Sequence, residues 1–217
     1  ECRRSKDVEV SDDYFAEKMT EVYKAYEELC ERESLVDFGE LLLRVYLLLK
    51  SNEEVLRHYQ RRFSHILVDE FQDTNEVQYQ FLKLLADGGA NFMSVGDDDQ
   101  SIYGWRGAKS ENINRFTNDY NNTEVIRLEQ NYRSTSVILS AANEVIKNNQ
   151  GRMGKELWTD QKEGEPISVY SAYNEDDEAR YIVGSIQNWV NQGRSLDEVA
   201  ILYRSNAQSR VLEEAIL

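Results

Sequence analysis

The sequence predicts an α/β protein in which a parallel, doubly wound sheet follows an all-helical N-terminal segment. Apolar residues recur at three- and four-residue steps through roughly the first 60 residues, as they do on one face of a helix. Beyond residue 64, short apolar runs alternate with amphipathic stretches, which is the pattern of parallel βα units. A hydrophobic share of 41% is enough for a packed core.

The N-terminal segment is expected to contain three helices, over 12–32, 38–50 and 52–62. The second of these is very apolar. Asp37 followed by Glu40 resembles a capping box at its start, because a short acidic side chain can accept a hydrogen bond from the backbone three residues on.

The remainder of the chain is expected to alternate strands with helices. Strands are predicted at 66–68, 92–95, 124–128, 167–172 and 199–203, and helices at 75–86, 109–119, 134–148, 175–191 and 206–217. Pro166 stands at a strand start, where a missing N–H is tolerated. The polar, glycine-containing stretch 151–165 is predicted to be a long loop.

Composition limits the classes of function. Cys2 and Cys30 provide neither a disulfide framework nor a metal-binding spacing, which fits a reducing cytoplasm. No apolar run approaches the ~18–20 residues of a membrane span, so no membrane partner is expected. The net charge of −15 counts against simple binding of phosphates, and any DNA must be held in a local groove with base stacking.

The most informative local pattern is the apolar run 66–68 followed by Asp69 and Glu70, a Walker-B arrangement. The carboxyl end of a parallel strand is where ligands bind, so Asp69 can hold Mg²⁺ there. Glu70 can then orient and deprotonate the water that attacks a γ-phosphate. The alternative is that the two acids only cap the helix at 75–86.

A longer pattern, GDDDQSIYGWRGA, occupies 96–108. Its three consecutive acids suggest a metal site, but the spacing is not that of a calcium loop. Gln100 is a neutral donor and acceptor, suited to sensing a phosphate.

The second half of this pattern places Trp105 and Arg106 between Gly104 and Gly107. The glycines allow the backbone to present the indole outward, and an exposed tryptophan beside an arginine is a plausible platform for base stacking. The alternative is that Tyr103 and Trp105 pack the loop onto the domain.

Two further junctions between an apolar run and a helix carry arginines. In QNYRS at 130–134, Arg133 precedes a helix whose N-cap could be Ser134, so it could reach a phosphate, and Tyr132 could stack on a base. In LYRSNAQSR at 202–210, arginine, amide and hydroxyl groups could hold DNA phosphates. The alternatives are a surface turn with an ordinary ion pair and a solvated helix start.

Taken together, DEFQDTN at 69–75, the block 96–108 and QNYRS at 130–134 resemble motifs two, three and four of the UvrD, Rep and PcrA group of superfamily-one DNA helicases. Their order and spacing match, and the resemblance covers essentially the whole chain. It implies a RecA-like, P-loop NTPase α/β fold.

The resemblance also implies site residues. The implied catalytic residues are Glu70, Asp69, Gln100 and Arg133, with Asp69 as the magnesium ligand. The implied nucleotide-binding residues are Tyr132, Arg133, Gln100 and Gln72, the two glutamines connecting the nucleotide site to the DNA site. The implied DNA-binding residues are Trp105, Tyr103, Arg106, Arg204 and Asn206.

The family's organisation assigns 1–63 to part of a helical insertion, 64–129 to the second half of a first RecA-like motor domain, and 130–217 to the start of a second. It implies ATP and Mg²⁺ as cofactors. The implied partners are single-stranded DNA and duplex junctions, with repair proteins as further candidates. The implied activity is 3′–5′ translocation and unwinding in a bacterial cytoplasm.

The sequence departs from the family in one respect: it contains no Gly-x-x-x-x-Gly-Lys-Ser/Thr loop to cradle the phosphates. We expect that loop upstream and the later motifs downstream, and the chain alone to be inactive. Two other classes remain open: a non-catalytic binding module that uses the Trp105 loop, and a metal-dependent hydrolase whose ligands are Asp69, Glu70 and the acids at 97–99.

Overall fold

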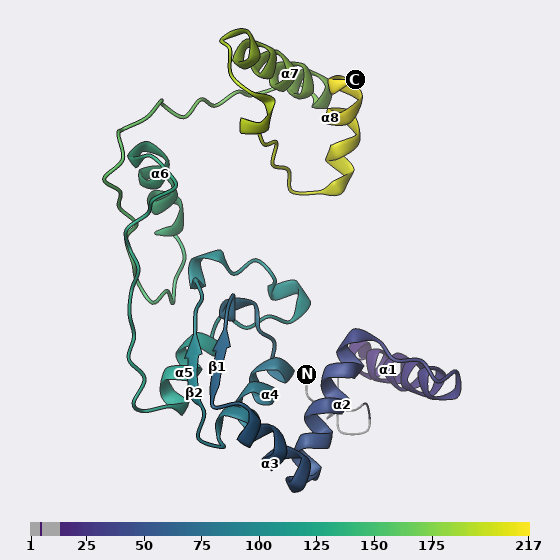
Figure 1. Ribbon diagram of the computed structural model, residues 1–217. Coiled ribbons are helices and arrows are strands. Elements are labelled where there is room, and N and C mark those ends of the chain that lie inside the picture. The colour runs from purple at the N-terminus through teal and green to yellow at the C-terminus, as the bar shows by residue number, and fades with distance from the viewer. Residues whose placement is uncertain (1–4, 6–13) are drawn as a thin grey trace. The chain divides into compact units, whose positions relative to one another are not determined.

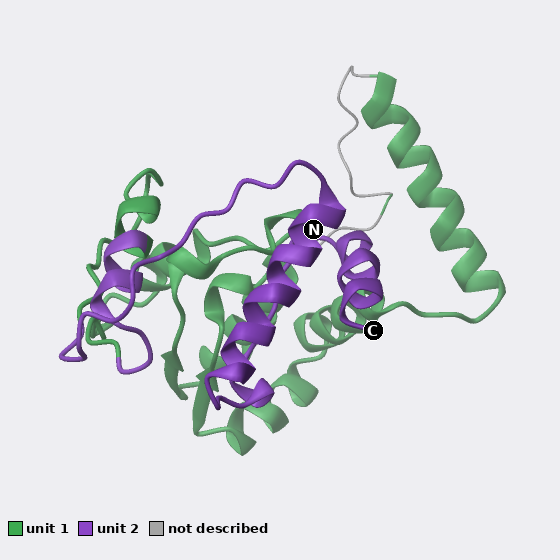
Figure 2. Ribbon diagram, turned by 90° about the horizontal axis from the view of Figure 1, so that it is seen from above, with its two compact units in different colours: residues 1–131, 142–158 green, residues 132–141, 159–217 purple. Residues whose placement is uncertain are grey.

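The computed structural model describes residue 5 and residues 14–217. The chain divides into two compact units, drawn in different colours in Figure 2. Unit 1 comprises Glu1–Asn131 and Ala142–Trp158, and unit 2 comprises Tyr132–Ala141 and Thr159–Leu217. The division falls inside one helix, α6 (Ser136–Ile146).

Unit 1 begins with the three helices that the sequence predicts: α1 (Tyr14–Arg32), α2 (Phe38–Ser51) and α3 (Glu53–Arg62). Residue 12, the first of the expected first helix, lies outside the described residues. The start of α2 is capped as expected, because the Asp37 side chain accepts a hydrogen bond from the Glu40 N–H at 2.7 Å.

A small parallel sheet follows, formed by β1 (His65–Val68) and β2 (Asn91–Ser94), with His65 opposite Asn91. The helix α4 (Glu76–Ala86) connects the two strands, which lie side by side in Figure 1. This βαβ unit confirms the predicted α/β class.

Two apolar clusters hold unit 1 together. In the first, Phe71, Tyr79 and Phe116 are buried between the 3₁₀ turn after β1, α4 and α5 (Asn112–Asp119). The second joins α2 to α4 through Leu43, Tyr46 and Val77. The turn that carries the Asp-Glu pair is therefore anchored in an aromatic core.

Three of the predicted strands, 124–128, 167–172 and 199–203, are wrong as strands. A strand is defined by ladder hydrogen bonds, and in the part of the chain that the structure describes these segments have no ladder partner. Their apolar side chains are consequently exposed, with Val169 and Leu202 each 93% accessible.

Unit 2 contains α7 (Glu175–Asn191) and α8 (Ser209–Ile216), both close to the predicted ranges. The Asn174 side chain caps α7, and a 3₁₀ turn, Asn206–Gln208, leads into α8. Among the described residues, no helix is both long and apolar enough to cross a membrane.

Candidate nucleotide and DNA site

Asp69 and Glu70 follow β1 directly, and both are exposed at the carboxyl end of the strand. Glu70 adopts the left-handed conformation, with φ 50° and ψ 43°. This region costs a non-glycine residue roughly 1–2 kcal/mol. Strain of this kind persists where the surrounding structure imposes it, and here the next residue, Phe71, is fully buried.

Gln72 connects this strand end to the next. Its side-chain Nε2 donates to Glu70 Oε2 at 2.6 Å, and its Oε1 accepts from the Asp97 N–H at 2.9 Å. The residue is 1% exposed, so both amide groups are satisfied inside the protein. The carboxyl ends of β1 and β2 are therefore joined by one buried side chain.

The three consecutive acids Asp97, Asp98 and Asp99, here called the acidic triplet, follow β2 and are held by the segment 151–155 of the same unit. Arg152 donates to both oxygens of Asp99 at 2.6 and 2.7 Å, the Met153 N–H donates to Asp98 at 2.8 Å, and Lys155 forms an ion pair with Asp97. The paired side chains are between 12% and 23% exposed, which makes these ion pairs half-buried contacts.

Electrostatics in the triplet follow from these contacts. Burial raises the pKa of the Asp97 carboxyl, but hydrogen bonds from Lys155 and Gln100 outweigh burial and leave the pKa below its ordinary value. The Asp99 carboxylate raises the pKa of Arg152.

This arrangement weighs against a metal site at the triplet. Oxygens of the three acids lie within 4.8 Å of one another, close enough to share a cation. A guanidinium and an ammonium group already form ion pairs with Asp99 and Asp97, and a divalent ion shared by the three acids would have to displace both. The reading of this chain as a metal-dependent hydrolase that uses the triplet is thereby disfavoured.

The Trp105 loop projects its aromatic side chain outward, as expected. Trp105 is 77% exposed on the 3₁₀ turn Gly104–Arg106, and the turn ends at Gly107, whose φ of 85° suits glycine. The Arg106 guanidinium lies 4.6 Å from the Trp105 ring centroid and 4.8 Å from that of Tyr103. Arg106 thus covers part of the aromatic surface.

The remaining predicted residues lie in unit 2. Tyr132 is 75% exposed, and its carbonyl oxygen accepts from Gln161 Nε2 at 2.6 Å. Arg133 is also exposed. Arg204 and Asn206 are exposed at the turn before α8, where the Gln208 side chain accepts from the Arg204 N–H at 3.2 Å.

Comparison with known proteins matches the sequence model of the UvrD/REP helicase N-terminal domain to residues 3–121, more than half of the chain, and that of the UvrD-like helicase C-terminal domain to 126–217. The chain belongs to the UvrD/REP helicase family.

Several bacterial helicases are close in sequence to this family member. It is 63% identical to DNA helicase II of Escherichia coli (strain K12) over 196 residues, or 90% of the chain and 27% of that protein. DNA helicase II of Haemophilus influenzae is 54% identical over 99% of the chain and 29% of its own length. ATP-dependent DNA helicase PcrA of Staphylococcus aureus (strain Mu50) is 48% identical over 94% of the chain and 28% of its length. The chain thus spans under a third of these relatives.

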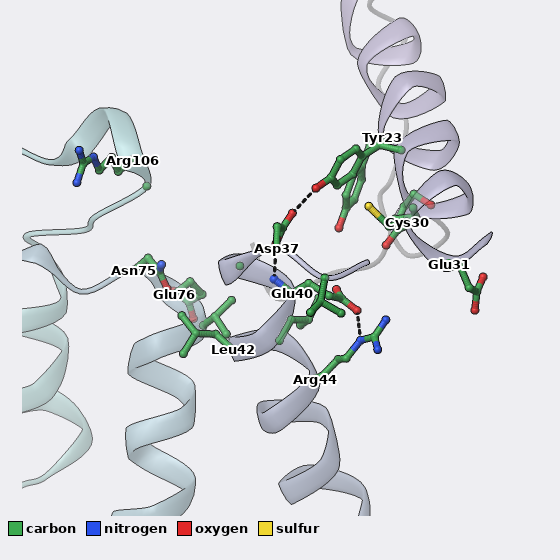
Figure 3. Close-up of a pocket in the computed structure, with 18 of the residues that line it drawn as sticks. Tyr23, Cys30, Glu31, Asp37, Glu40, Leu42, Arg44, Asn75, Glu76 and Arg106 are labelled. Carbon is green, nitrogen blue, oxygen red and sulfur yellow. Dashed lines mark hydrogen bonds and ion pairs between the residues drawn. The ribbon is translucent and has the colours of Figure 1, made fainter. Parts of the chain in front are cut away.

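A cavity of about 730 Å³ lies in unit 1 of this helicase-family chain, beside the start of α2 (Figure 3). Its walls come mainly from α1, α2, the start of α4 and the loop residues Arg106, Gly107 and Lys109. Carboxylates outnumber cations among the described lining residues, and Arg44 is paired with Glu40. An acidic lining of this kind disfavours a phosphate ligand.

Sequence reasoning missed three residues of the site. Gly96 lies against the Gln72 amide, and Arg152 and Lys155 hold the triplet from more than 50 positions away. The only signal in the sequence was the presence of two basic residues, Arg152 and Lys155, three positions apart in an acidic chain. The loop at 151–165 has no hydrophobic periodicity, so its position in the fold could not be predicted.

Proposed function

We propose that the full-length protein to which this chain belongs is an ATP-driven DNA helicase. The observation that carries the proposal lies at the carboxyl ends of β1 and β2. There Glu70, which follows the exposed Asp69, is connected through the buried Gln72 side chain to Asp97, in the segment that leads to Trp105. The names of the bacterial relatives, DNA helicase II and ATP-dependent DNA helicase PcrA, support it. We further propose 3′–5′ translocation on single-stranded DNA, unwinding at duplex junctions, and action with repair proteins on the nucleoid in the cytoplasm.

The proposed cofactors are ATP and Mg²⁺. Carboxylate oxygens at the end of a parallel strand are the hard donors that Mg²⁺ prefers, and exposed Asp69 fits this role. Bound there, the ion would supply charge stabilisation for the phosphates. Glu70 would hold and deprotonate the attacking water, because its carboxylate is exposed and oriented by the Gln72 amide.

Three further residues are proposed to contact the nucleotide. Tyr132 would stack on adenine with its exposed ring, Arg133 would contact the γ-phosphate, and Gln100 would sense that phosphate. The Gln100 side chain now donates to Asp97 Oδ2 at 2.7 Å, so its carbonyl oxygen and second N–H are the groups that a ligand could engage.

Single-stranded DNA is proposed to lie against Trp105, Tyr103 and Arg106, with its backbone at Arg204 and Asn206. The exposed indole of Trp105 supports this proposal. Because the chain has a net negative charge, we expect base stacking to supply most of the affinity for DNA.

Replacing Trp105 with Ala in the full-length protein should weaken single-strand binding by ~1–3 kcal/mol, or roughly 5- to 150-fold in Kd, the usual worth of one base stack. Fluorescence titration with a labelled oligonucleotide measures this. Trp189→Ala is the matched control, because Trp189 also lies against an arginine, Arg194, at 3.9 Å but outside the motifs. Equal Kd values for Trp105→Ala and the wild type, with the fold intact, would reject the stacking role.

For domain organisation we propose that 1–63 belongs to a helical insertion, 64–129 to the first RecA-like motor domain and 130–217 to the second. The matched family models change between 121 and 126, and the compact units change first after Asn131, which supports a division in this region.

The 217-residue chain by itself is proposed to hydrolyse no ATP, since it contains no Gly-x-x-x-x-Gly-Lys-Ser/Thr sequence to hold the β- and γ-phosphates. Phosphate release with and without single-stranded DNA tests this, with the full-length protein as the positive control. Magnesium-dependent, DNA-stimulated turnover by the chain would contradict the proposal.

A further inference from the structure

The surroundings of Gln72 define what this side chain does. Its amide is buried, its nitrogen donates to the Glu70 carboxylate, and its oxygen accepts from the backbone of Asp97. An amide with these two groups engaged and 1% of its surface exposed has no direct route to a nucleotide. Any effect of Gln72 on chemistry therefore has to pass through Glu70.

The backbone around Gln72 is built to hold this amide in place. The Val95 N–H donates to Val68 O at 2.8 Å, and the Phe71 N–H donates to Val95 O at 3.0 Å, which continues the pairing of β1 and β2 beyond the strand ends. A Cβ atom added at Gly96 would lie 2.7 Å from Gln72 Oε1, closer than such atoms approach, and 3.2 Å from the Phe71 N. A side chain at 96 would therefore displace the Gln72 amide from its present position.

Glu70 needs such a partner. A glutamate at a strand end has several rotatable bonds, and an exposed carboxylate samples many positions unless it is held. The left-handed backbone at Glu70 sets the direction of the side chain, and the Gln72 donor fixes one carboxylate oxygen at 2.6 Å. In the proposed mechanism the other oxygen would accept the proton of the attacking water.

We propose that Gln72 is a positioning residue for the general base: its carbonyl is anchored on the Asp97 N–H, and its N–H holds the Glu70 carboxylate where it meets the attacking water. The inference rests on the proposed helicase function and replaces a direct nucleotide contact by Gln72 with an action through Glu70. The backbone N–H of Asp97, in the acidic triplet, thereby fixes the position of Gln72 and, through it, that of the Glu70 carboxylate.

The test uses the full-length protein with three changes. Gln72→Glu keeps an acceptor for the Asp97 N–H and replaces the amide donor with a second buried carboxyl group, which either repels the Glu70 carboxylate or holds a proton between the two groups. Gln72→Met removes both links, and Gly96→Ala displaces the amide without altering either partner. Each change is expected to lower kcat for DNA-stimulated ATP hydrolysis by roughly 10- to 100-fold, the order expected when a reacting group is misplaced by about 1 Å. The Kd of a fluorescent nucleotide should stay within about twofold.

A double-mutant cycle separates positioning from other causes. In a Glu70→Gln background, Gln72→Met should produce no further fall in kcat, because the group that it positions has already lost its basicity. Asn112→Ala is the matched control for loss of a buried amide: Asn112 is also 1% exposed, and its side-chain Nδ2 donates to the Thr74 carbonyl and hydroxyl oxygens and not to Glu70, so kcat should not change.

Amide hydrogen exchange provides a readout that does not depend on turnover. Exchange at the Asp97 N–H should accelerate in Gln72→Met and stay slow in Gln72→Glu, since only the first loses the acceptor. Unaltered Asp97 exchange in Gln72→Met, additive losses with Glu70→Gln, or a changed nucleotide Kd with unchanged kcat would each overturn the positioning role. A wild-type protein without DNA-stimulated hydrolysis, or one in which Glu70→Gln has no effect, would instead overturn the proposed function.

Discussion

Glu70→Gln in the full-length protein should lower the rate of DNA-stimulated ATP hydrolysis by at least ~10²–10⁴-fold, the usual weight of general-base catalysis, and stop unwinding with it. The change preserves size, and a glutamine carbonyl can still accept the hydrogen bond that Gln72 Nε2 now donates to Glu70 Oε2. The local geometry should survive while the proton acceptor is lost. Nucleotide binding should therefore remain largely intact.

Phosphate release, strand separation and titration with a fluorescent nucleotide measure the three parts of this result. Glu124→Gln serves as the control, because it makes the same chemical change at an exposed glutamate outside the site. Unwinding at the normal rate by the Glu70→Gln protein would remove Glu70 from the mechanism. Loss of nucleotide binding in parallel with hydrolysis would show that the carboxylate holds the ligand instead of acting as the base.

Phe71→Ala is expected to destabilise unit 1 by ~3–5 kcal/mol, the range for truncating a buried phenylalanine. Phe71 is 1% exposed and makes edge-to-face contacts with Tyr79, Phe92 and Phe116 at centroid distances of 6.0, 6.4 and 5.6 Å. Truncation would leave a cavity and remove three aromatic pairs, each worth about 0.5–1.5 kcal/mol beyond burial.

Native-state hydrogen exchange at core amides of α4 measures this loss locally, which suits a protein of more than one domain. Phe38→Ala is the matched control: Phe38 is 88% exposed, so the same truncation should change stability by less than about 0.5 kcal/mol. Equal protection factors in the two variants would show that the aromatic cluster does not anchor the turn. Because Phe71 lies between Glu70 and Gln72, its loss should also lower ATP turnover.

The sequence alone predicted the features that are determined by residues close together in the chain. Helices α1 to α4 and α7 appear close to their predicted ranges because their apolar periodicity and caps, such as Asp37, lie within each segment. The placement of Asp69 and Glu70 at a strand end followed from a single apolar run. Exposure of Trp105 followed from the flanking glycines.

Other features depended on partners distant in sequence, and only the tertiary structure decided them. The runs at 124–128, 167–172 and 199–203 have strand-like composition, but a strand exists only where a ladder partner supplies hydrogen bonds, and the described residues supply none. The acidic triplet resembles a metal site in the sequence, but Arg152 and Lys155, more than 50 residues away, form ion pairs with Asp99 and Asp97. The burial of Gln72 likewise requires β1 and β2 to be side by side, because its two partners become neighbours only through that pairing.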